Sequence, residues 1–207
     1  LLRLSQQYFL TSASVQNIIR DHMAVYRDIE SLPDKVAIHI NDTHPALVIP
    51  ELMRILMDEY FLSWEKAWDI TVRTVSYTNH TVMPEALEKW SEDIFGLKLP
   101  RIHMIVKEIN ERFGREAWNA YPGNWNRIAG MSVLSYGQVN MANLAVIGSH
   151  SINGVSKLHS EILKESLFKS FYRMYPERFT NVTNGVAHRR WLCYSNPRLA
   201  ALLDECI

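Results

Sequence analysis

The sequence predicts an α/β protein with a parallel sheet, because strand-like segments alternate with helical ones along the chain. Residues 35–40 and 74–78 are rich in β-branched or aromatic side chains, which is typical of short strands. The residues between them have the spacing of helices. A strand, a helical crossover and a second strand lie parallel in one sheet. The polar residues that follow each strand are therefore expected at the same sheet edge, where open α/β sheets bind ligands.

The first third of the chain is predicted to hold a long helix, the first strand and two shorter helices. Apolar and aromatic residues recur at steps of three and four over residues 1–25, as on one face of an amphipathic helix. The side chains expected on this face are Leu1, Leu4, Tyr8, Val15, Ile18, His22 and Val25. Pro33 then interrupts the helix before the first strand. Helices follow over 46–60 and 64–73, the second with Ser63 as its N-cap.

The rest of the chain alternates helices, turns and a further strand. Pro84 suits the first turn of a helix, where its missing N–H costs nothing, and Glu85 and Glu88 suit the positive helix N-terminus. We therefore predict a helix from Pro84 to about Trp90. Further helices are predicted at 99–113, 125–131, 155–166, 189–194 and 197–204, turns at 121–124 and 153–154, an extended piece at 136–140, an apolar segment at 141–149 and a strand at 179–183.

Length and composition restrict the class of protein. At 207 residues the chain could form one large α/β domain or one and a half smaller ones. Lys and Arg number 22, as do Asp and Glu, and this zero net charge does not indicate a nucleic-acid surface. No apolar run reaches membrane-spanning length. Cys193 and Cys206 are too few for a disulfide framework, so free thiols in a reducing cytosol are expected.

Polar clusters at three predicted strand ends are the candidate site. They are Asn41-Asp42-Thr43-His44-Pro45, Asn79-His80-Thr81 and Asn184-Gly185. Imidazoles, carboxylates and amides gathered at one sheet edge suit the binding of a polar ligand. The alternative is a buried hydrogen-bond network in which the side chains only hold the turns, and the side chains that it would include are Asp42, His44, His80 and Glu88.

Metal and nucleotide sites are disfavoured. His39 and Asp42 point to opposite faces of a strand, so they do not converge with His44 and His80 on one ion. No Cys, HExxH or CxxC accompanies them. The chain also has no GxGxxG motif and no P-loop, so the sequence shows no cradle for a nucleotide phosphate.

Four groups of residues, in this order along the chain, carry a family resemblance. They are Asn41 to Pro45, Tyr77 to Trp90, His150 to Gly154 with His159-Ser160-Glu161, and Thr183-Asn184-Gly185 with Arg189-Arg190-Trp191. Together they resemble the α-glucan phosphorylases, which are the glycogen, starch and maltodextrin phosphorylases. The resemblance covers essentially the whole chain, and several motifs of this length in this order are very specific.

The resemblance implies a fold and an activity for the parent enzyme. Two Rossmann-like lobes of the GT-B glycosyltransferase type would enclose the active site. Pyridoxal 5′-phosphate would be bound through a Schiff base to a lysine, with its phosphate serving as proton donor and acceptor towards inorganic phosphate. The reaction would release glucose 1-phosphate, with retention, from the non-reducing end of an α-1,4-glucan. Members of this family are typically homodimers, and a cytoplasmic enzyme is expected.

The resemblance also implies roles for particular residues. His80 matches the histidine that hydrogen-bonds the glucose being transferred, and Asn184 matches the asparagine at the 6-hydroxyl of the same sugar. Asp42 and His44 match the loop beside the sugar-accepting subsite. Glu88 matches a carboxylate that lines the channel next to the sugar, and Trp191 a residue packed near the cofactor. No residue is expected to bind a metal.

The chain departs from the family pattern in several places. Nothing in it matches the cofactor lysine segment or the basic phosphate-binding loop, and both ends look cut, so we expect an inactive internal fragment. Lys107 replaces an aromatic residue of a glycogen storage site, and 136–139 lacks an acidic and basic pair, which favours soluble maltodextrins over anchored glycogen. Residues 1–182 are expected in the N-terminal lobe and 183–207 in the C-terminal lobe.

Two other functions are open from the sequence. One is a non-catalytic carbohydrate-binding or scaffold module that keeps the same half-cleft. The other is a two-lobed sugar transferase that uses a nucleotide sugar, as glycogen synthases do. The absence of nucleotide-binding glycines together with the motif of residues 79–90 argues against the transferase.

Overall fold

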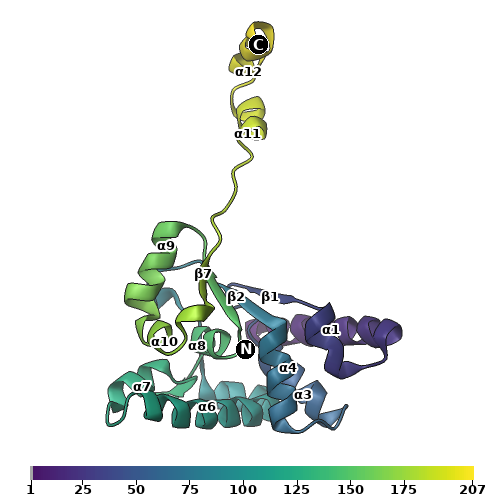
Figure 1. Cartoon of the computed structure of the whole chain (residues 1–207), viewed down its shortest axis with the longest axis vertical. Helices are drawn as coiled ribbons and strands as arrows, with labels where there is room; N and C mark the ends of the chain where they lie inside the picture. Colours follow the sequence, from purple (N-terminus) through teal and green to yellow (C-terminus); the bar gives the residue numbers. More distant parts are fainter. Residues whose placement is uncertain (1) are drawn as a thin grey trace.

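A four-stranded parallel sheet forms the centre of the computed structural model, which describes residues 2–207 (Figure 1). Its strands lie in the order β1 (Ile38–Asn41), β2 (Val75–Thr78), β6 (Ser151–Gly154) and β7 (Phe179–Asn181). Asn41 lies beside Thr78, and Thr78 lies beside Asn153, so the carboxyl ends of neighbouring strands meet at one edge. The predicted parallel α/β sheet and the shared edge of its polar clusters are confirmed.

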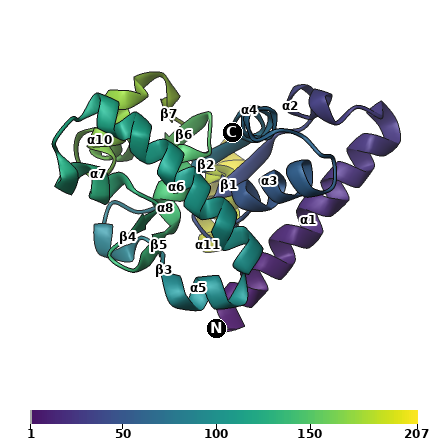
Figure 2. The same ribbon diagram turned by 90° about the horizontal axis from the view of Figure 1, so that it is seen from below.

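The remaining elements of the described chain are mostly helices. They are α1 (Leu2–Tyr26), α2 (Leu32–Lys35), α3 (Val48–Asp58), α4 (Trp64–Thr74), α5 (Glu92–Lys98), α6 (Pro100–Ala120), α7 (Trp125–Met131), α8 (Met141–Ile147), α9 (Lys157–Ile162), α10 (Lys169–Met174), α11 (His188–Ser195) and α12 (Pro197–Cys206), with 3₁₀ turns η1 (Ile29–Ser31), η2 (Pro84–Ala86) and η4 (Pro176–Arg178) and the π-helical turn η3 (Leu163–Leu167). Helix α3 packs against α1, α4 and α6, and Figure 2 shows α6 crossing the underside of the molecule.

The core lies between the sheet and its helices, as the hydrophobic pattern predicts. Ile40, Tyr77 and Ile152 on three adjacent strands are fully buried. Helix α4 begins where predicted, because the Ser63 side chain accepts a hydrogen bond from the Lys66 N–H at 3.4 Å.

The long N-terminal helix is confirmed, and most of its predicted face is correct. Leu4, Val15 and His22 are buried, while Tyr8 and Ile18 are half-buried. Val25 was expected on this face but is 70% exposed, because the helix ends at Tyr26, beyond the core. Leu1 lies outside the described residues.

The predicted helix from Pro84 to Trp90 is wrong. Only the 3₁₀ turn η2 forms there, and Leu87 is already extended, with φ −69° and ψ 128°. Strand β3 (Lys89–Ser91) follows and pairs antiparallel with β5 (Gln138–Asn140), so that Trp90 lies opposite Val139. This pairing with a segment far along the chain outweighs the local helix signals, because cross-strand contacts stabilise an extended conformation.

A second sheet, in the order β3-β5-β4, was not expected from the sequence. Strand β4 (Leu134–Ser135) joins β5 through Tyr136 and Gly137, whose φ values are both positive, at 51° and 69°. Two such residues form the tight turn that suits a two-residue hairpin loop. The predicted extended piece at 136–140 therefore holds only for its last three residues.

The predicted turn at Asn153-Gly154 is also wrong, because both residues belong to β6. A Cβ on Gly154 would lie 2.7 Å from the Ser160 Oγ and 2.9 Å from the Ser160 nitrogen. Glycine is needed here for the close approach of α9 to the strand, rather than for a turn. The predicted helix at 155–166 begins later, at Lys157, and changes to a π-helical turn at Leu163.

The other predicted elements are largely present. The turn at 121–124 and the helices at 125–131, 189–194 and 197–204 match the structure within one or two residues, and the helix at 99–113 extends to Ala120. Helices α2, α5 and α10 were not predicted, and the apolar segment at 141–149 forms the helix α8. Beyond Phe179 no residue of the described chain is buried, and Figure 1 shows α11 and α12 extending away from the sheet.

None of the helices formed by residues 2–207 combines the length and the apolar character needed to cross a membrane.

Replacing Gly148 by alanine is expected to destabilise the fold by about 1–3 kcal/mol, because overpacking displaces core side chains. A Cβ there would lie 2.6 Å from Cδ1 and 2.7 Å from Cγ2 of Ile49, which is fully buried. Gly114 in α6 is the matched control, since its added Cβ meets nothing within 4 Å and alanine favours helix. In urea denaturation, the free energy of unfolding should fall for Gly148→Ala and rise for Gly114→Ala. A Gly148→Ala protein as stable as the unaltered protein would contradict this packing.

Candidate functional site

The candidate site is a hollow of about 500 Å³ at the carboxyl edge of the central sheet. Its lining comes from the strands β1, β2 and β6 and from the chain that follows β2 and β7. The lining residues are His39, Asn41, Thr78, His80, Asn153, Val182 and Asn184. The fold therefore brings together two predicted site residues, His80 and Asn184, that are far apart in the sequence.

His80 stands at the mouth of this hollow, where the chain leaves β2. Its side chain is exposed, and its Nε2 lies 2.5 Å from the Asn41 Oδ1. Because an amide oxygen only accepts, Nε2 carries the proton and donates to Asn41. In the neutral ring, Nδ1 is then an acceptor. The imidazole thus has a defined orientation, and its exposed side chain remains accessible to a ligand.

The loop under His80 is held by Asn79, which is fully buried. Its Nδ2 donates to the Tyr77 hydroxyl at 3.0 Å, and its Oδ1 accepts from the Thr81 N–H at 3.0 Å. Burial raises the pKa of Tyr77 above its ordinary value, so this hydroxyl stays neutral. A buried, hydrogen-bonded anchor thus fixes the backbone on both sides of His80.

The floor of the hollow is a line of hydrogen bonds across three strands. The Thr78 hydroxyl donates to the Asn153 Oδ1 at 2.7 Å, so it accepts from the His39 Nε2–H. The His39 Nδ1 then accepts from the Ser76 hydroxyl at 3.1 Å. Sequence reasoning missed Asn153 because the Asn-Gly pair is a strong turn signal. It also missed His39, which was considered only as a metal ligand.

Asn184 reaches the hollow because the chain beyond β7 stays hydrogen-bonded to the loop after β6. The Val182 N–H donates to the Gly154 carbonyl at 3.3 Å, and the Asn184 N–H donates to the Val155 carbonyl at 3.0 Å. The Asn184 amide is exposed and forms part of the hollow's lining. Its position depends on the backbone, which leaves both amide atoms available to a ligand.

Glu88 and His44 form a second group outside the lining of this hollow. The Glu88 carboxylate accepts from the Gln7 Nε2 at 2.8 Å and from the Thr43 hydroxyl at 3.3 Å, and its Oε2 lies 3.7 Å from the His44 Nδ1. The Glu88 side chain is 17% exposed and that of His44 is 53% exposed. The buried-network alternative therefore describes Glu88 well, but it does not describe His44 or His80.

Asp42 is part of the turn that follows β1. Its φ of 65° is left-handed, a conformation that Asp tolerates better than most residues. Its N–H donates to the Thr78 carbonyl at 3.0 Å, and its Oδ1 accepts from the Thr43 N–H at 2.6 Å. These bonds hold the polar loop close to the end of β2.

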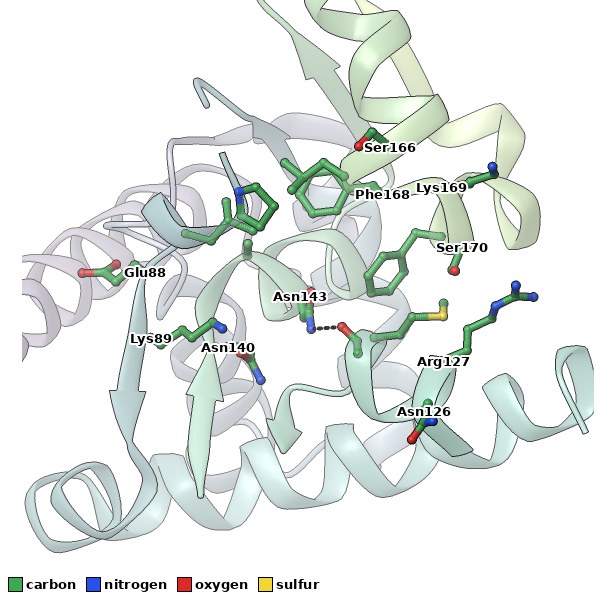
Figure 3. A pocket seen from close by; sticks show the side chains of 17 residues that line it. Glu88, Lys89, Asn126, Arg127, Asn140, Asn143, Ser166, Phe168, Lys169 and Ser170 are labelled. Carbon is green, nitrogen blue, oxygen red and sulfur yellow. Dashed lines mark hydrogen bonds between the residues drawn. The ribbon is translucent and has the colours of Figure 1, made fainter. Parts of the chain in front are cut away.

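A second hollow, of about 560 Å³, lies between β3, α7, α8 and α10 (Figure 3). It is lined by amides such as Asn140 and Asn143 and by Phe168, and the Asn143 Nδ2 donates to the Gly130 carbonyl at 3.0 Å. Figure 3 shows the Glu88 carboxylate directed away from the middle of this hollow. None of the other predicted site residues lines it, so the sheet-edge hollow is the candidate site.

Trp191 is the predicted site residue that the structure does not bring to the others. It lies on α11, beyond the end of the sheet, and its side chain is 68% exposed.

The lining of the sheet-edge hollow, among the described residues, includes no lysine or arginine. Residues 2–207 also contain no group of three His, Cys, Asp or Glu side chains arranged to hold a metal.

Comparisons with known proteins give a consistent result. The family model described as "Phosphorylase: Carbohydrate phosphorylase" matches residues 1–207. The chain is 55% identical over 207 residues to "Glycogen phosphorylase" of Bacillus subtilis (strain 168) and 49% identical over 209 residues to "Glycogen phosphorylase" of Chlamydia pneumoniae. It is 49% identical over 217 residues to "Glycogen phosphorylase, muscle form" of Bos taurus.

Each of these matches includes all of the present chain but only part of the relative. The shared region is 26% of the Bacillus subtilis and Bos taurus proteins and 25% of the Chlamydia pneumoniae protein. The chain thus spans about a quarter of the length of the curated relatives it matches.

Proposed function

Because this chain belongs to the carbohydrate phosphorylase family, we propose that the protein carrying it releases glucose 1-phosphate from the non-reducing end of an α-1,4-glucan, using inorganic phosphate. The relatives are named glycogen phosphorylases, but each is about four times as long as this chain, so the activity is assigned to the whole protein. The observation that carries the proposal is the meeting of His80 and Asn184 in one hollow at the carboxyl edge of the sheet.

We assign the two lining side chains to the glucose that is transferred. The His80 imidazole and the Asn184 amide can each donate and accept hydrogen bonds. This suits the hydroxyl groups of a sugar, which also do both. Such bonds count for more in a cleft from which water is excluded. Asp42 and His44 belong to the loop that we place beside the accepting sugar, and Glu88 to the wall of the channel.

The residues of this chain do not fit the phosphate of pyridoxal 5′-phosphate. The sheet-edge hollow has no cationic side chain in its described lining, and Trp191, the residue assigned near the cofactor, is exposed. An anion in a cleft needs a charged or well-oriented donor set. We propose that the lysine and the phosphate-binding groups belong to another part of the protein, and that residues 1–207 alone form no glucose 1-phosphate.

We also propose a lobe boundary near residue 183. The last strand of the sheet ends at Asn181, and none of residues 180–207 is buried. The exposed helices α11 and α12 would then pack within a second, C-terminal lobe. A cytoplasmic homodimer acting on soluble maltodextrin is the assembly we assign to the whole protein.

The test uses the intact protein that contains this chain, with maltoheptaose as the glucan. Formation of glucose 1-phosphate is measured with and without inorganic phosphate and with and without pyridoxal 5′-phosphate. Product that requires both supports the proposal. No product, with maltoheptaose still protecting the protein against heat, would instead identify a carbohydrate-binding module. Glucan extension from a nucleotide sugar would identify a synthase.

Replacing Asn184 by alanine is expected to lower kcat/KM for maltoheptaose about ten-fold, the equivalent of one lost hydrogen bond of about 1.4 kcal/mol. The melting temperature should not change, since the bond between the Asn184 N–H and the Val155 carbonyl involves only the backbone. Asn126→Ala is the matched control, because Asn126 is an exposed asparagine that lines the second hollow. Equal activity of the two variants would remove Asn184 from the site.

A further inference from the structure

His159 is a buried histidine that lies outside the lining of the hollow but bonds to the backbone segments that directly follow β2 and β6. It lies in the first turn of α9 and is 8% exposed. Its Nδ1 accepts from the Val155 N–H at 3.1 Å, and its Nε2 lies 3.3 Å from the Thr81 carbonyl oxygen. Since one partner only donates and the other only accepts, Nδ1 acts as the acceptor and Nε2 as the donor.

These two bonds reach the backbone next to both proposed sugar-binding residues. Thr81 directly follows His80 in the loop after β2. Val155 accepts the Asn184 N–H through its own carbonyl at 3.0 Å. A single imidazole therefore connects the segment that carries His80 to Val155, whose carbonyl in turn holds the backbone of Asn184.

The helix that carries His159 is itself held firmly on the sheet. The Ser156 hydroxyl caps α9 by accepting from the His159 N–H at 3.1 Å. The Ser160 Oγ lies 2.9 Å from the Asn181 Oδ1, at the end of β7. Gly154 lets the helix approach, because a Cβ there would meet the Ser160 backbone. The imidazole thus extends from a rigid support, and residues on rigid elements position neighbouring groups most accurately.

We propose that His159 is a positioning residue for the phosphorolysis inferred above, on which this proposal rests. It sets the spacing between the His80 imidazole and the Asn184 amide, so that both can bind one glucose unit. His159 does not line the hollow, so it acts through these two residues and not on the sugar itself. Misplacing a binding group by about 1 Å can cost on the order of 100-fold in rate.

Two conservative variants each keep one of the two His159 bonds. We call the bond to the Val155 N–H the Asn184 arm and the bond to the Thr81 carbonyl the His80 arm. In His159→Asn, the side-chain oxygen can replace Nδ1 as the acceptor for the Val155 N–H, which keeps the Asn184 arm. In His159→Gln, the side-chain amide can replace Nε2–H as the donor to the Thr81 carbonyl, which keeps the His80 arm. His159→Leu removes both bonds while leaving a side chain of similar bulk.

The control is His22→Leu, which replaces another buried histidine whose single backbone partner, the Asp28 carbonyl, lies in the same N-terminal region. All variants are made in the intact protein, and kcat and KM for maltoheptaose are measured with the melting temperature. We expect His159→Leu to lower kcat/KM on the order of 10- to 100-fold. Each conservative variant should recover part of this loss. His22→Leu should lower the melting temperature but not kcat/KM per folded molecule.

A double-mutant cycle supplies the decisive readout, because residues that act through one another have non-additive effects. In a protein that already carries His80→Ala, His159→Asn should cost much less than it does with His80 present, because the bond it loses positions a side chain that is no longer there, whereas His159→Gln should keep its effect. The proposal is overturned if the effects of His159 and His80 simply add, or if all three His159 variants keep full kcat/KM.

The same variants distinguish failure of this proposal from failure of the proposed function. Maltoheptaose binding is measured by calorimetry alongside activity. If the unaltered protein makes no glucose 1-phosphate but binds maltoheptaose, the phosphorolysis assignment fails, and weaker binding in His159→Leu would still support the positioning role. Unchanged binding and activity in His159→Leu would reject His159 while leaving the function intact.

Discussion

We expect replacement of His80 by alanine to lower kcat/KM for the phosphorolysis of maltoheptaose on the order of 100-fold, the typical cost of removing one preorganised hydrogen-bonding group from an active site. His80 lines the sheet-edge hollow, and its bond from Nε2 to the Asn41 Oδ1 fixes the direction of the ring. The measurement is steady-state formation of glucose 1-phosphate by the intact protein at saturating phosphate.

The fold should tolerate this change, because the His80 side chain is exposed. Asn79, which anchors the loop, keeps its bonds to Tyr77 and Thr81. His150→Ala is the matched control. His150 is also exposed and donates to one backbone carbonyl, that of Val72, but it lies at the opposite, amino end of β6. A His80→Ala enzyme as active as the His150→Ala enzyme would reject His80 as a sugar-binding residue.

The second large effect is expected on stability, when Arg54 is replaced by methionine. Arg54 forms two bonds to the carboxylate of Glu51, from Nε at 3.0 Å and from Nη2 at 2.9 Å. The Glu51 side chain is fully buried, and Tyr8 and Ser12 also donate to it. Hydrogen bonding to Glu51 raises the pKa of Arg54, so the guanidinium stays charged at neutral pH.

Removing one partner of a buried ion pair leaves an uncompensated charge, which costs about 3–5 kcal/mol. Arg54→Met should therefore lower the free energy of unfolding by about 3 kcal/mol in urea denaturation. Adding Glu51→Gln should recover part of this loss, since the remaining charge is then gone. Arg20→Met, at a side chain that is 75% exposed, should change the same quantity by less than about 0.5 kcal/mol. Similar losses at positions 20 and 54 would contradict the importance of the buried pair.

Local patterns determined the elements whose signals agree with their tertiary surroundings. The amphipathic face of α1, the Ser63 cap of α4 and the buried strand β2 were all predictable, because periodicity, capping and β-branched composition each act over a few residues. The βαβ order then placed the clusters after β1 and β2 at one edge, which the pairing of Asn41 with Thr78 confirms.

Long-range pairing decided the elements that the sequence analysis assigned wrongly. Residues 84–90 carry helix signals, yet β3 forms because Trp90 can lie opposite Val139 in a second sheet. Residues 153–154 carry a turn signal, yet they end a central strand because they pair with Thr180 and Asn181 of β7. In both cases a partner distant in the chain contributes more than the local preference, which is worth only tenths of a kcal/mol per residue.

The sequence was sufficient to identify the parallel α/β class and the family to which the chain belongs, and to propose His80 and Asn184 as site residues, since motifs are contiguous and can be read without coordinates. The tertiary structure decided which side chains share a surface. It joined His80 and Asn184 in one hollow, directed Glu88 towards Gln7 and Thr43, and placed His159 between two loops. Such contacts depend on strand register and helix packing, which many weak interactions across the chain set together.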